Sequence, residues 1–596
     1  MTRFPLLLLL AACSGPADEP APADTDTVVP CEPVVWALDA DGDGFGDADG
    51  GRGGCAARAG EVAGATDCDD ADATVHPDAV ESCETPGDDD CDGDTNEQDA
   101  VGCTWWYRDE DGDTYGTTSK ECFCEPYHSW SADNNDDCDD ENLTVYPGAV
   151  DLAWGNGVEY DCVRGTAGVA DADATLTGVA PDDFTGWEVA GAGDVDADGY
   201  DDLLIGAPHM AETFRAGTFG TTYLVRGPVE GTVSLASAEA VFTLEAWHQY
   251  AGLSLASAGD VNGDGFADVL IGAITGDAAD AGAAYLLHGP ITGPLGPTDA
   301  DATWSGGTTL DRAGAAVAGG EDLDGDGLDD FVVGAPKSAE GGDSSGAVYV
   351  ASGPLTGTHS LPTATTTLVG EDDADWAGSG LAVASDINGD GVADVLVAAS
   401  GRGVVYVLYG PLGGRIDLSA ADAMLTGAAS AVDVAGDIDG DGLDDILAGT
   451  TPPRTGGVAY LVLGAPRGVW ALADTADAVF NGDRDEGIEE VGEAIAGAGD
   501  VDGDGTDDLL FGAPVTSDDG DLRGAAFLVY GPVTGTVRLD RADETFFGNG
   551  VNAFAGYAVA AAGDTNGDDF ADFLVGSPCD DPGGNSSGSA SLFLGR

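Results

Sequence analysis

Seven short segments of this chain place aspartate or asparagine at every second position and end on a further aspartate. Their common pattern is D-x-[DN]-x-[DN]-G-x-x-D, and the last copy departs from it with Asp569 in place of the glycine. Calcium takes about six to eight oxygen ligands. Positions 1, 3, 5 and 9 offer side-chain oxygens, position 7 offers its backbone carbonyl, and glycine at position 6 permits a sharp turn. The spacing therefore predicts seven calcium sites.

The predicted ligands share these five positions in every copy, with the position-7 residue named last in each set. They are Asp194, Asp196, Asp198, Asp202 and Tyr200; Asp260, Asn262, Asp264, Asp268 and Phe266; Asp322, Asp324, Asp326, Asp330 and Leu328; Asp386, Asn388, Asp390, Asp394 and Val392; Asp437, Asp439, Asp441, Asp445 and Leu443; Asp500, Asp502, Asp504, Asp508 and Thr506; and Asp564, Asn566, Asp568, Asp572 and Phe570.

Other metals and other loop types fit this pattern less well. Magnesium demands tighter octahedral geometry and keeps more of its water than a loop so rich in carboxylates suits. Transition metals favour His or Cys, which these loops lack. A helical EF-hand needs a glutamate at position 12, where the first loop has Ile205. The flanks read as strands, so we expect β-hairpins that are clipped by metal, with a structural role for the ion.

The elements that position these loops recur with them, at a period of about 60 residues, which suits a four-stranded propeller blade. In the first copy, strand-like segments occupy residues 188–192, 203–205, 222–228 and 241–244. The pattern predicts an all-β, seven-bladed propeller over residues 174–596. The chain stops at a third strand, 590–594, and we expect the upstream segment 175–178 to complete the last blade. Such closure would remove exposed sheet edges.

The frame around the loops resembles the FG-GAP repeat of integrin α-subunit propellers and related bacterial proteins. The first copy shows it as Phe184-Thr-Gly186 before the loop and Gly206-Ala-Pro208 after it, and the similarity extends over all seven copies. The fifth copy is short and lacks the aromatic opening, so its blade is the weakest match. The resemblance implies a seven-bladed propeller that binds another macromolecule at the rim opposite the metal loops.

Residues 31–163 hold two similar units rich in cysteine and aspartate. In the first, Asp39, Asp41, Asp43 and Asp47 repeat the 1-3-5-9 spacing, with Phe45 at position 7. The second, with Asp109, Asp111 and Asp113, lacks an acid at position 9. The units resemble a metal-binding motif common in exported proteins of myxobacteria, and the nearby DCDD sequences are possible further ligands. A relative of this motif is associated with copper, but His76 and His128 are too few to support copper here.

Cysteines concentrate in the same region, where ten lie between Cys31 and Cys162. Dense cysteine in an exported chain is typical of disulfides in a small module that lacks a core of its own. We expect Cys83 and Cys91 to pair locally. A bridge from Cys162 to Cys579 across the propeller closure is a further hypothesis.

The first residues read as an export signal. Residues 1–12 carry one basic residue, an apolar run and two alanines, and Leu10-Ala-Ala-Cys13 resembles the lipobox of bacterial lipoproteins. That resemblance implies acylation of Cys13 and an outer-membrane lipoprotein facing the cell surface or periplasm. Ordinary signal cleavage is the alternative. Residues 13–30 are rich in proline, alanine and acids, which predicts a disordered linker.

Charge and missing motifs narrow the function. The chain has 110 acidic and 19 basic residues, a net charge of -91, which disfavours nucleic acid or anionic lipid as a partner. No metalloprotease, nucleophile-elbow or phosphate-loop motif occurs, so we predict that the protein is not an enzyme. We expect adhesion or binding to an extracellular protein or polysaccharide. The alternatives are a matrix protein bridged by calcium and a carbohydrate-binding lectin.

Overall fold

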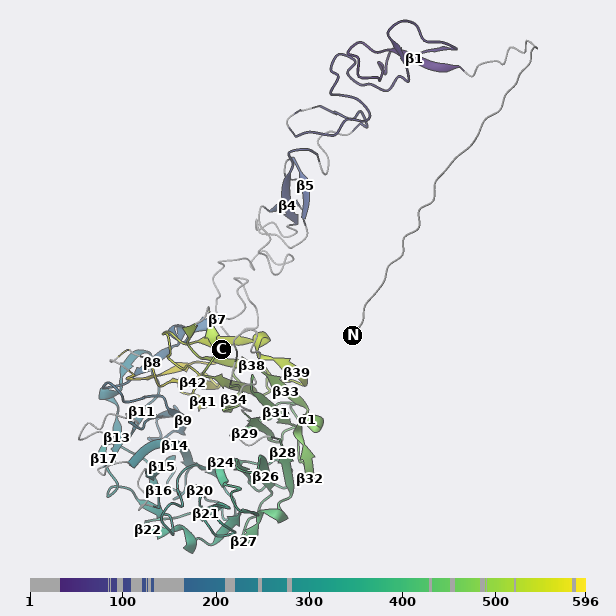
Figure 1. The fold of residues 1–596 in the computed structure, drawn as a ribbon. Coiled ribbons are helices and arrows are strands. Elements are labelled where there is room, and N and C mark those ends of the chain that lie inside the picture. The colour runs from purple at the N-terminus through teal and green to yellow at the C-terminus, as the bar shows by residue number, and fades with distance from the viewer. Residues whose placement is uncertain are drawn as a thin grey trace, which may run out of the picture. The chain divides into compact units, whose positions relative to one another are not determined.

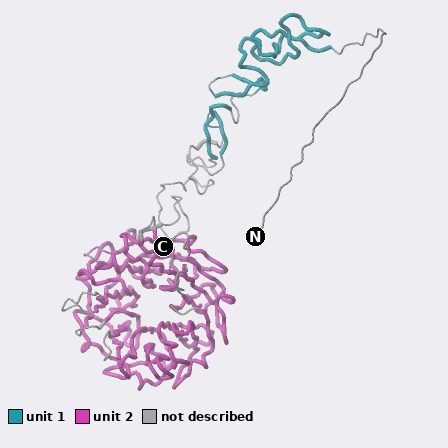
Figure 2. Tube along the Cα trace, in the orientation of Figure 1, with its two compact units in different colours: residues 1–147 teal, residues 148–596 magenta. Residues whose placement is uncertain are grey.

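A computed structural model describes residues 33–83, 85, 87–93, 100–108, 120–124, 126, 130–132, 166–209, 220–244, 249–275, 281–427, 431–450, 456–482, 488, 490–518, 521–580, 582 and 586–596. The predicted signal, the linker, Cys13, Cys162, His128 and the aspartate loop at 109–117 lie outside these residues. The chain forms two compact units, residues 1–147 and 148–596, which are described separately (Figure 2).

The N-terminal unit contains two small antiparallel sheets. The first has the order β2-β1-β3, with β1 at Val34–Leu38, β2 at Arg52–Gly54 and β3 at Glu61–Ala63. The second has the order β5-β4-β6, with β4 at Thr104–Arg108, β5 at Lys120–Phe123 and β6 at Trp130–Ala132. Strands this short bury little apolar surface, so covalent links must hold much of the unit together.

Disulfides supply such links, and the three between described residues correct a prediction. The pairs are Cys68–Cys91, Cys83–Cys124 and Cys103–Cys122. The predicted bridge between Cys83 and Cys91 is therefore wrong. The backbone N–H of Cys83 donates to the carbonyl of Val101 at 3.0 Å. This bond holds Cys83 against the segment that precedes β4, and beside Cys124.

The C-terminal unit is built from seven five-stranded sheets among the described residues, arranged as a ring in Figure 1. From the inner strand outward, the first four sheets are β9 (Glu188–Gly193), β10 (Asp202–Ala207), β11 (Thr221–Val225), β13 (Ala240–Thr243), β17 (Gly293–Leu295); β14 (Gln249–Gly259), β15 (Asp268–Thr275), β16 (Ala283–Leu287), β18 (Ala302–Ser305), β22 (Gly357–Ser360); β19 (Val317–Glu321), β20 (Asp330–Ala335), β21 (Ala347–Ser352), β23 (Thr366–Val369), β27 (Gly414–Asp417); and β24 (Ala377–Ala384), β25 (Asp394–Ala399), β26 (Val404–Leu408), β28 (Ala423–Thr426), β32 (Gly468–Ala471).

The last three sheets, in the same order, complete the ring. They are β29 (Ala431–Gly436), β30 (Asp445–Thr450), β31 (Val458–Val462), β33 (Ala478–Asn481), β39 (Gly535–Arg538); β34 (Ala494–Gly499), β35 (Asp508–Ala513), β38 (Ala525–Val529), β40 (Glu544–Phe547), β7 (Thr166–Gly168); and β41 (Val559–Gly563), β42 (Asp572–Ser577), β43 (Ser589–Phe593), β8 (Ala174–Thr177), β12 (Gly231–Ser234). The seven-bladed propeller is thus confirmed, and the fifth blade has all its strands despite its short repeat.

Each blade has one strand more than the four predicted from the repeat. In blades 1 to 5 and blade 7, the outermost strand comes from the following repeat around the ring and pairs in parallel with the fourth strand; β17, for example, lies beside β13. These strands are short and mostly exposed, as in Gly231–Ser234, so they carry no apolar pattern that would reveal them in the sequence. They cover the sheet edge that four strands would leave bare.

The ring closes with residues from the start of the unit, as predicted. β8 pairs antiparallel with β43, with Leu176 opposite Ala590, and becomes the fourth strand of blade 7. β7 pairs in parallel with β40 and supplies the outermost strand of blade 6. The propeller sheets therefore begin before residue 174, the predicted start, because two upstream strands take part in closure.

The core lies between neighbouring blades. The second strands are buried along their length, as in Asp330–Ala335, because both faces of each sheet pack against a neighbour. Between blades 6 and 7, for example, Phe546 packs on Phe593 and Phe573, with ring centroids 4.5 and 5.4 Å away. Burial of such side chains stabilises the fold by about 1.5–3 kcal/mol each.

Candidate metal centres

The predicted metal loops join the inner strand of each blade to the second strand. The position-9 aspartate is the first residue of that second strand and is buried, with 0 to 1% of its surface exposed in all seven copies. In the first loop, Asp202 accepts the backbone N–H of Val195 at 3.1 Å and that of Gly227 at 3.0 Å. All seven copies repeat this pair of bonds, at 2.7 to 3.2 Å. This carboxylate is thereby fixed at the base of the loop.

The position-1 aspartate organises the turn above it. Asp194 accepts the backbone N–H groups of Asp198 and Gly199, at 3.1 and 2.9 Å, and the other six loops repeat the arrangement. Position 6 has a positive φ throughout, from 81° to 95° for the six glycines. Asp569 takes the same conformation in the last loop, with φ of 72°. Its side chain makes that turn costlier than a glycine would.

These constraints bring predicted ligands together. One oxygen from each of Asp194, Asp196 and Asp202 lies within 4.8 Å of the other two, and the equivalent aspartates of the third loop, Asp322, Asp324 and Asp330, cluster in the same way. The position-5 carboxylate of Asp198 accepts the backbone N–H of Tyr200 at 3.1 Å, which turns the chain back toward the second strand. Such a cluster of carboxylates can hold a metal ion.

The electrostatics of the position-9 carboxylates favour a bound cation. Burial, together with the negative charge of Asp324, raises the pKa of Asp330 to about 7. Burial also raises the pKa of Asp202 to about 6. An ion would offset the cost of holding these charges close together.

The loops also contact one another around the ring, through residues that the sequence did not reveal. The backbone N–H of Ala267, at position 8 of the second loop, donates to the carbonyl of Asp194 at 3.0 Å. Equivalent bonds link Asp201 to Asp564, Asp444 to Asp386, Asp507 to Asp437 and Ala571 to Asp500. Where position 8 is an aspartate, its carboxylate accepts the position-1 N–H of the neighbouring loop: Asp201 from Asp564, Asp329 from Asp260, Asp444 from Asp386 and Asp507 from Asp437.

A matching glycine makes room for this carboxylate. A Cβ on Gly563, the residue before Asp564, would lie 2.0 Å from an oxygen of Asp201, and Gly436 bears the same relation to Asp507 at 2.2 Å. The pair Asp-Asp at positions 8 and 9 was the available signal. Which loop the extra aspartate would reach depends on the ring and could not be read from one repeat.

A basic side chain, that of Arg226, lies beside the first loop. A guanidinium nitrogen of Arg226 lies 2.5 Å from one oxygen of Asp196, and another donates to the carbonyl of Ile291 at 3.2 Å. The other oxygen of Asp196 is buried without a hydrogen-bond partner. Arg226 thus neutralises part of the charge at a position predicted to bind metal.

In the N-terminal unit, the structure brings three of the four predicted aspartates together. Oxygens of Asp39, Asp41 and Asp43 lie within 4.8 Å of one another, and the backbone N–H of Phe45 donates to Asp43 at 2.8 Å. The carboxylate of Asp47 accepts the N–H of Asp49 at 2.9 Å.

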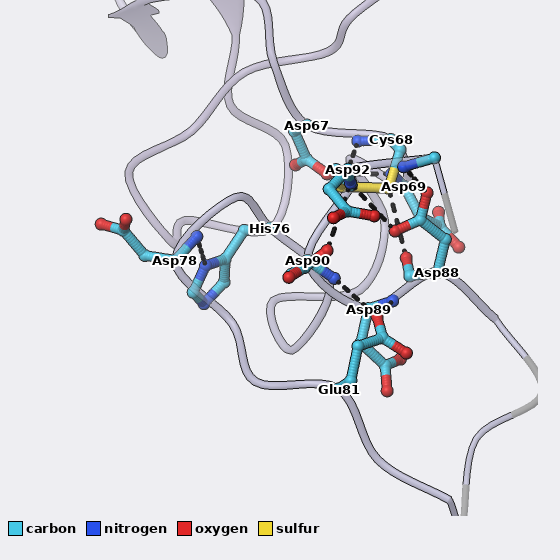
Figure 3. The surroundings of a disulfide bond; sticks show 12 residues. Asp67, Cys68, Asp69, His76, Asp78, Glu81, Asp88, Asp89, Asp90 and Asp92 are labelled. Carbon is cyan, nitrogen blue, oxygen red and sulfur yellow. Dashed lines mark hydrogen bonds between the residues drawn. A yellow bond between two sulfur atoms is a disulfide. The ribbon is translucent and has the colours of Figure 1, made fainter. Parts of the chain in front are cut away.

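A further aspartate loop in this unit was missed. Asp88 accepts the N–H groups of Asp92 and Gly93, at 3.1 and 3.0 Å, as position 1 does in the propeller loops, and Gly93 has φ of 105°. Oxygens of Asp88, Asp90 and Glu81 lie within 4.8 Å of one another, close to the Cys68–Cys91 disulfide in Figure 3. The sequence signal for this loop is the spacing of Asp88, Asp90 and Asp92 followed by Gly93.

Comparison with protein families identifies the repeats. The "FG-GAP repeat" model matches residues 185–224, 251–287 and 313–351, and the "FG-GAP-like repeat" model matches residues 386–448. A model described as "Putative metal-binding motif" matches residues 67–97 and 137–162. These matches, together with the acidic clusters, indicate that the protein binds a metal ion.

Curated relatives include integrin α chains. Integrin alpha-D of Homo sapiens is 40% identical over 147 residues, which is 24% of this chain and 12% of that protein. Integrin alpha-PS2 of Drosophila melanogaster is 34% identical over 178 residues, which is 27% of this chain and 12% of that protein. The match thus spans about an eighth of each relative. Among solved structures, one titled "COPII on membranes, outer coat vertex" has a TM-score of 0.36 at 9% identity, covering 70% of this chain and 85% of that one. The chain therefore carries FG-GAP repeats in a seven-bladed propeller and a metal-binding motif in its N-terminal unit, and it is similar over part of its length to integrin α chains.

Proposed function

We propose that this is an exported, lipid-anchored, calcium-binding protein whose propeller binds another macromolecule in adhesion. The observation that carries the proposal is the repetition of one loop geometry in seven blades, each built on a buried position-9 aspartate. A role in catalysis would not require seven copies of one site, whereas stabilising a ring of seven similar blades would require one site in each blade. The similarity to integrin α chains supports a binding role over an enzymatic one.

Calcium is the ion that we assign to the loops. Each loop offers side-chain oxygens at four positions, and their carboxylates carry several negative charges within a few ångströms. Calcium accepts such crowded, irregular oxygen sets more readily than magnesium does. The loops contain no His or Cys that would favour a transition metal.

The partner would bind at the rim opposite the metal loops. Because the strands alternate in direction, the loops between second and third strands lie at that opposite rim. One of them, residues 336–346, presents Lys337, whose ammonium group lies 3.3 Å from the ring centroid of Trp376. Trp376 is 38% exposed, and Leu310 is 55% exposed; the carbonyl of its neighbour Asp311 accepts the backbone N–H of Lys337 at 3.1 Å. Tryptophan is enriched among binding hot spots.

The anchor and the compartment depend on residues 1–30, so they stay proposals. Within the described residues, no helix is both long and apolar enough to span a bilayer. Lipidation of Cys13 would then hold the protein at the outer membrane. Labelling with a radioactive fatty acid, compared with a Cys13→Ser variant, tests this directly: the label should appear only in the protein with Cys13.

The binding proposal can be tested with the purified chain and fractionated cell-envelope protein and polysaccharide. We expect saturable binding to one fraction in calcium, and weaker binding by a Lys337→Ala/Trp376→Ala variant. A Val469→Ala variant is the matched control, because Val469 is 74% exposed but lies on the outer strand β32. Association that follows calcium without saturating would instead indicate a matrix role. Binding only to polysaccharide, lost on Trp105→Ala, would indicate a lectin, since Trp105 is 50% exposed in the N-terminal unit.

A further inference from the structure

We propose that the N-terminal unit holds a metal ion between two separate segments, the Asp39–Asp43 loop and the DCDD sequence at 67–70. The ligands would be Asp41 and Asp43 from the first segment and Asp67 and Asp70 from the second. Neither the loop pattern nor the matched family model, which begins at residue 67, joins these two segments. The site is independent of the propeller and of its partner.

The four carboxylates belong to two clusters that share one residue, Asp41. One oxygen from each of Asp41, Asp67 and Asp70 lies within 4.8 Å of the other two. Asp41 also belongs to the cluster with Asp39 and Asp43. Asp41 is therefore the point at which the two segments meet, and an ion beside it would reach carboxylates from both.

Asp67 provides an independent sign that something is bound there. Its side chain is buried, with 1% of its surface exposed, and its Oδ2 atom has no hydrogen-bond partner. The Oδ2 atoms of Asp41 and Asp43 are likewise buried without partners. A buried polar atom left unpaired costs about 1–3 kcal/mol, and more when it is charged. Three such oxygens, on aspartates of two clusters that share Asp41, are what a bound cation would satisfy.

The fold fixes Asp67 at this position. The backbone N–H groups of Thr66 and Asp67 both donate to the carbonyl of Gly46, at 2.9 and 3.1 Å, and the N–H of Ala48 donates to the carbonyl of Asp67 at 2.8 Å. The N–H of Ala40 donates to the Asp70 carboxylate at 2.9 Å. The Cys68–Cys91 disulfide then holds the DCDD segment from its other side.

The donors select the kind of ion. All four ligands are carboxylates, and Cys68 is tied up in its disulfide. His76 stacks on Phe45, with ring centroids 5.0 Å apart, and its Nδ1 accepts the N–H of Asp78 at 3.2 Å. The basic residue Arg52 pairs with Glu61 at 2.5 Å. The site therefore suits a hard, oxygen-loving divalent cation such as calcium, and not copper.

The experiment measures hydrogen exchange of the full chain during titration with calcium alone. In the wild-type protein, calcium should slow exchange in peptides that cover residues 39–48 and 66–71 together, at one concentration midpoint. Asp67→Asn should raise that midpoint by about tenfold or more, since even outer partners of metal ligands are worth about ten- to a hundredfold in affinity. Asp69→Asn is the matched control, because Asp69 is exposed in the same DCDD sequence. It should leave the midpoint unchanged.

A second measurement separates a lost ligand from a damaged fold. In EDTA, Asp67→Asn should exchange no faster than wild type, because the substitution removes repulsion among buried carboxylates, and peptide mapping should still find the Cys68–Cys91 bridge. Equal midpoints for wild type and Asp67→Asn would overturn the proposal, as would protection of 39–48 without 66–71. The propeller loops report separately in the same spectra, so failure here leaves the proposed function untouched.

Discussion

The carboxylate of Asp201 accepts the backbone N–H of Asp564 at 2.9 Å, although 363 positions of sequence separate the two residues. Asp201 belongs to the metal loop of the first blade, and Asp564 is the first predicted ligand of the last. The bond therefore ties together two metal loops at the point where the ring closes. Metal binding in one loop should therefore affect the metal affinity of the neighbouring loop.

Replacing Asp201 should weaken both closure and the seventh loop. Asp201→Ala leaves the partly buried N–H of Asp564 without its acceptor, which should cost about 1 kcal/mol of unfolding free energy. The melting temperature should fall by a few degrees in calcium, and the calcium midpoint for protection of residues 564–572 should rise. Glu230→Ala is the control, because Glu230 is an exposed acid of the same repeat. If both variants melted alike, the inter-loop bond would have no energetic role.

Removing the metal should destabilise the whole propeller. At a hundredfold excess over its dissociation constant, a ligand adds about 2.7 kcal/mol per site. Seven sites make the expected loss on chelation large, and we expect the melting temperature to fall by on the order of ten degrees or more. Calorimetry in EDTA, followed by readdition of calcium or magnesium, measures the loss and its ion selectivity. A melting curve that EDTA leaves unchanged would refute a structural role for the ion.

The seventh loop should bind calcium more tightly when its strained residue is relieved. Asp569→Gly removes the cost of a side chain at φ of 72°, about 1 kcal/mol, which corresponds to roughly fivefold in affinity. Asp569→Asn keeps the Cβ and removes only the charge, so it should not reproduce the gain. The reverse change in the sixth loop, Gly505→Asp, should weaken that loop by a similar factor. Hydrogen exchange of each loop against calcium concentration gives the comparison.

Arg226 should compete with the metal in the first loop. Its guanidinium contacts Asp196, so Arg226→Gln removes a positive charge from beside a predicted ligand. The calcium midpoint for residues 194–202 should fall several-fold, and less so at high salt because screening weakens the charge effect. Arg538→Gln is the control, since Arg538 pairs with Asp540 outside the loops, at 2.8 Å. A higher midpoint in Arg226→Gln would mean that the arginine assists binding.

The propeller should lose stability as the pH rises above about 5. Burial raises the pKa of Glu188, on the inner strand β9, to about 8, and that of Asp433, on β29, to about 7. A free glutamate ionises near about 4.3, so between these pH values the folded state holds protons that the unfolded state has released. Glu188→Gln should therefore melt a few degrees higher than wild type at pH 8.5 in saturating calcium, and close to wild type at pH 5. Glu230→Gln, at an exposed site, should show no such difference.

Much of the propeller could be predicted because its signals are local. The loop spacing lies within nine residues, and the apolar strands around it repeat seven times. Even ring closure could be predicted, because the last repeat lacks a fourth strand and the segment at 175–178 matches one, within one residue of the observed β8 at Ala174–Thr177. The outermost strands could not be predicted, because Gly231–Ser234 and its equivalents are mostly exposed and carry no apolar pattern.

The misses concern pairs of residues whose proximity depends on the fold. Cys91 has Cys83 near it in sequence, yet it pairs with Cys68, because the DCDD segment lies against the residue-91 turn. The DCDD sequence could be named as a source of further ligands, but the meeting of Asp67 and Asp41 depends on the backbone bonds that hold Thr66 and Asp67 against Gly46. Asp201 contacts Asp564 only in a closed ring. In each case, the sequence identifies a residue that could form the contact, but only the fold determines which partner lies close enough.

The pairing of β8 with β43 sets the order in which this protein can be completed. β8 is among the first propeller segments to leave the ribosome, and its antiparallel partner β43 is the last of the described propeller strands. Until that last strand arrives, β8 has neither a finished sheet nor a sealed edge, and blade 7 does not exist. The ring can therefore close only after β43 has been synthesised. A variant that lacks residues 587–596 would lose the pairing that closes the ring as well as a strand of blade 7, and it would be exposed to proteases and to pairing with other chains.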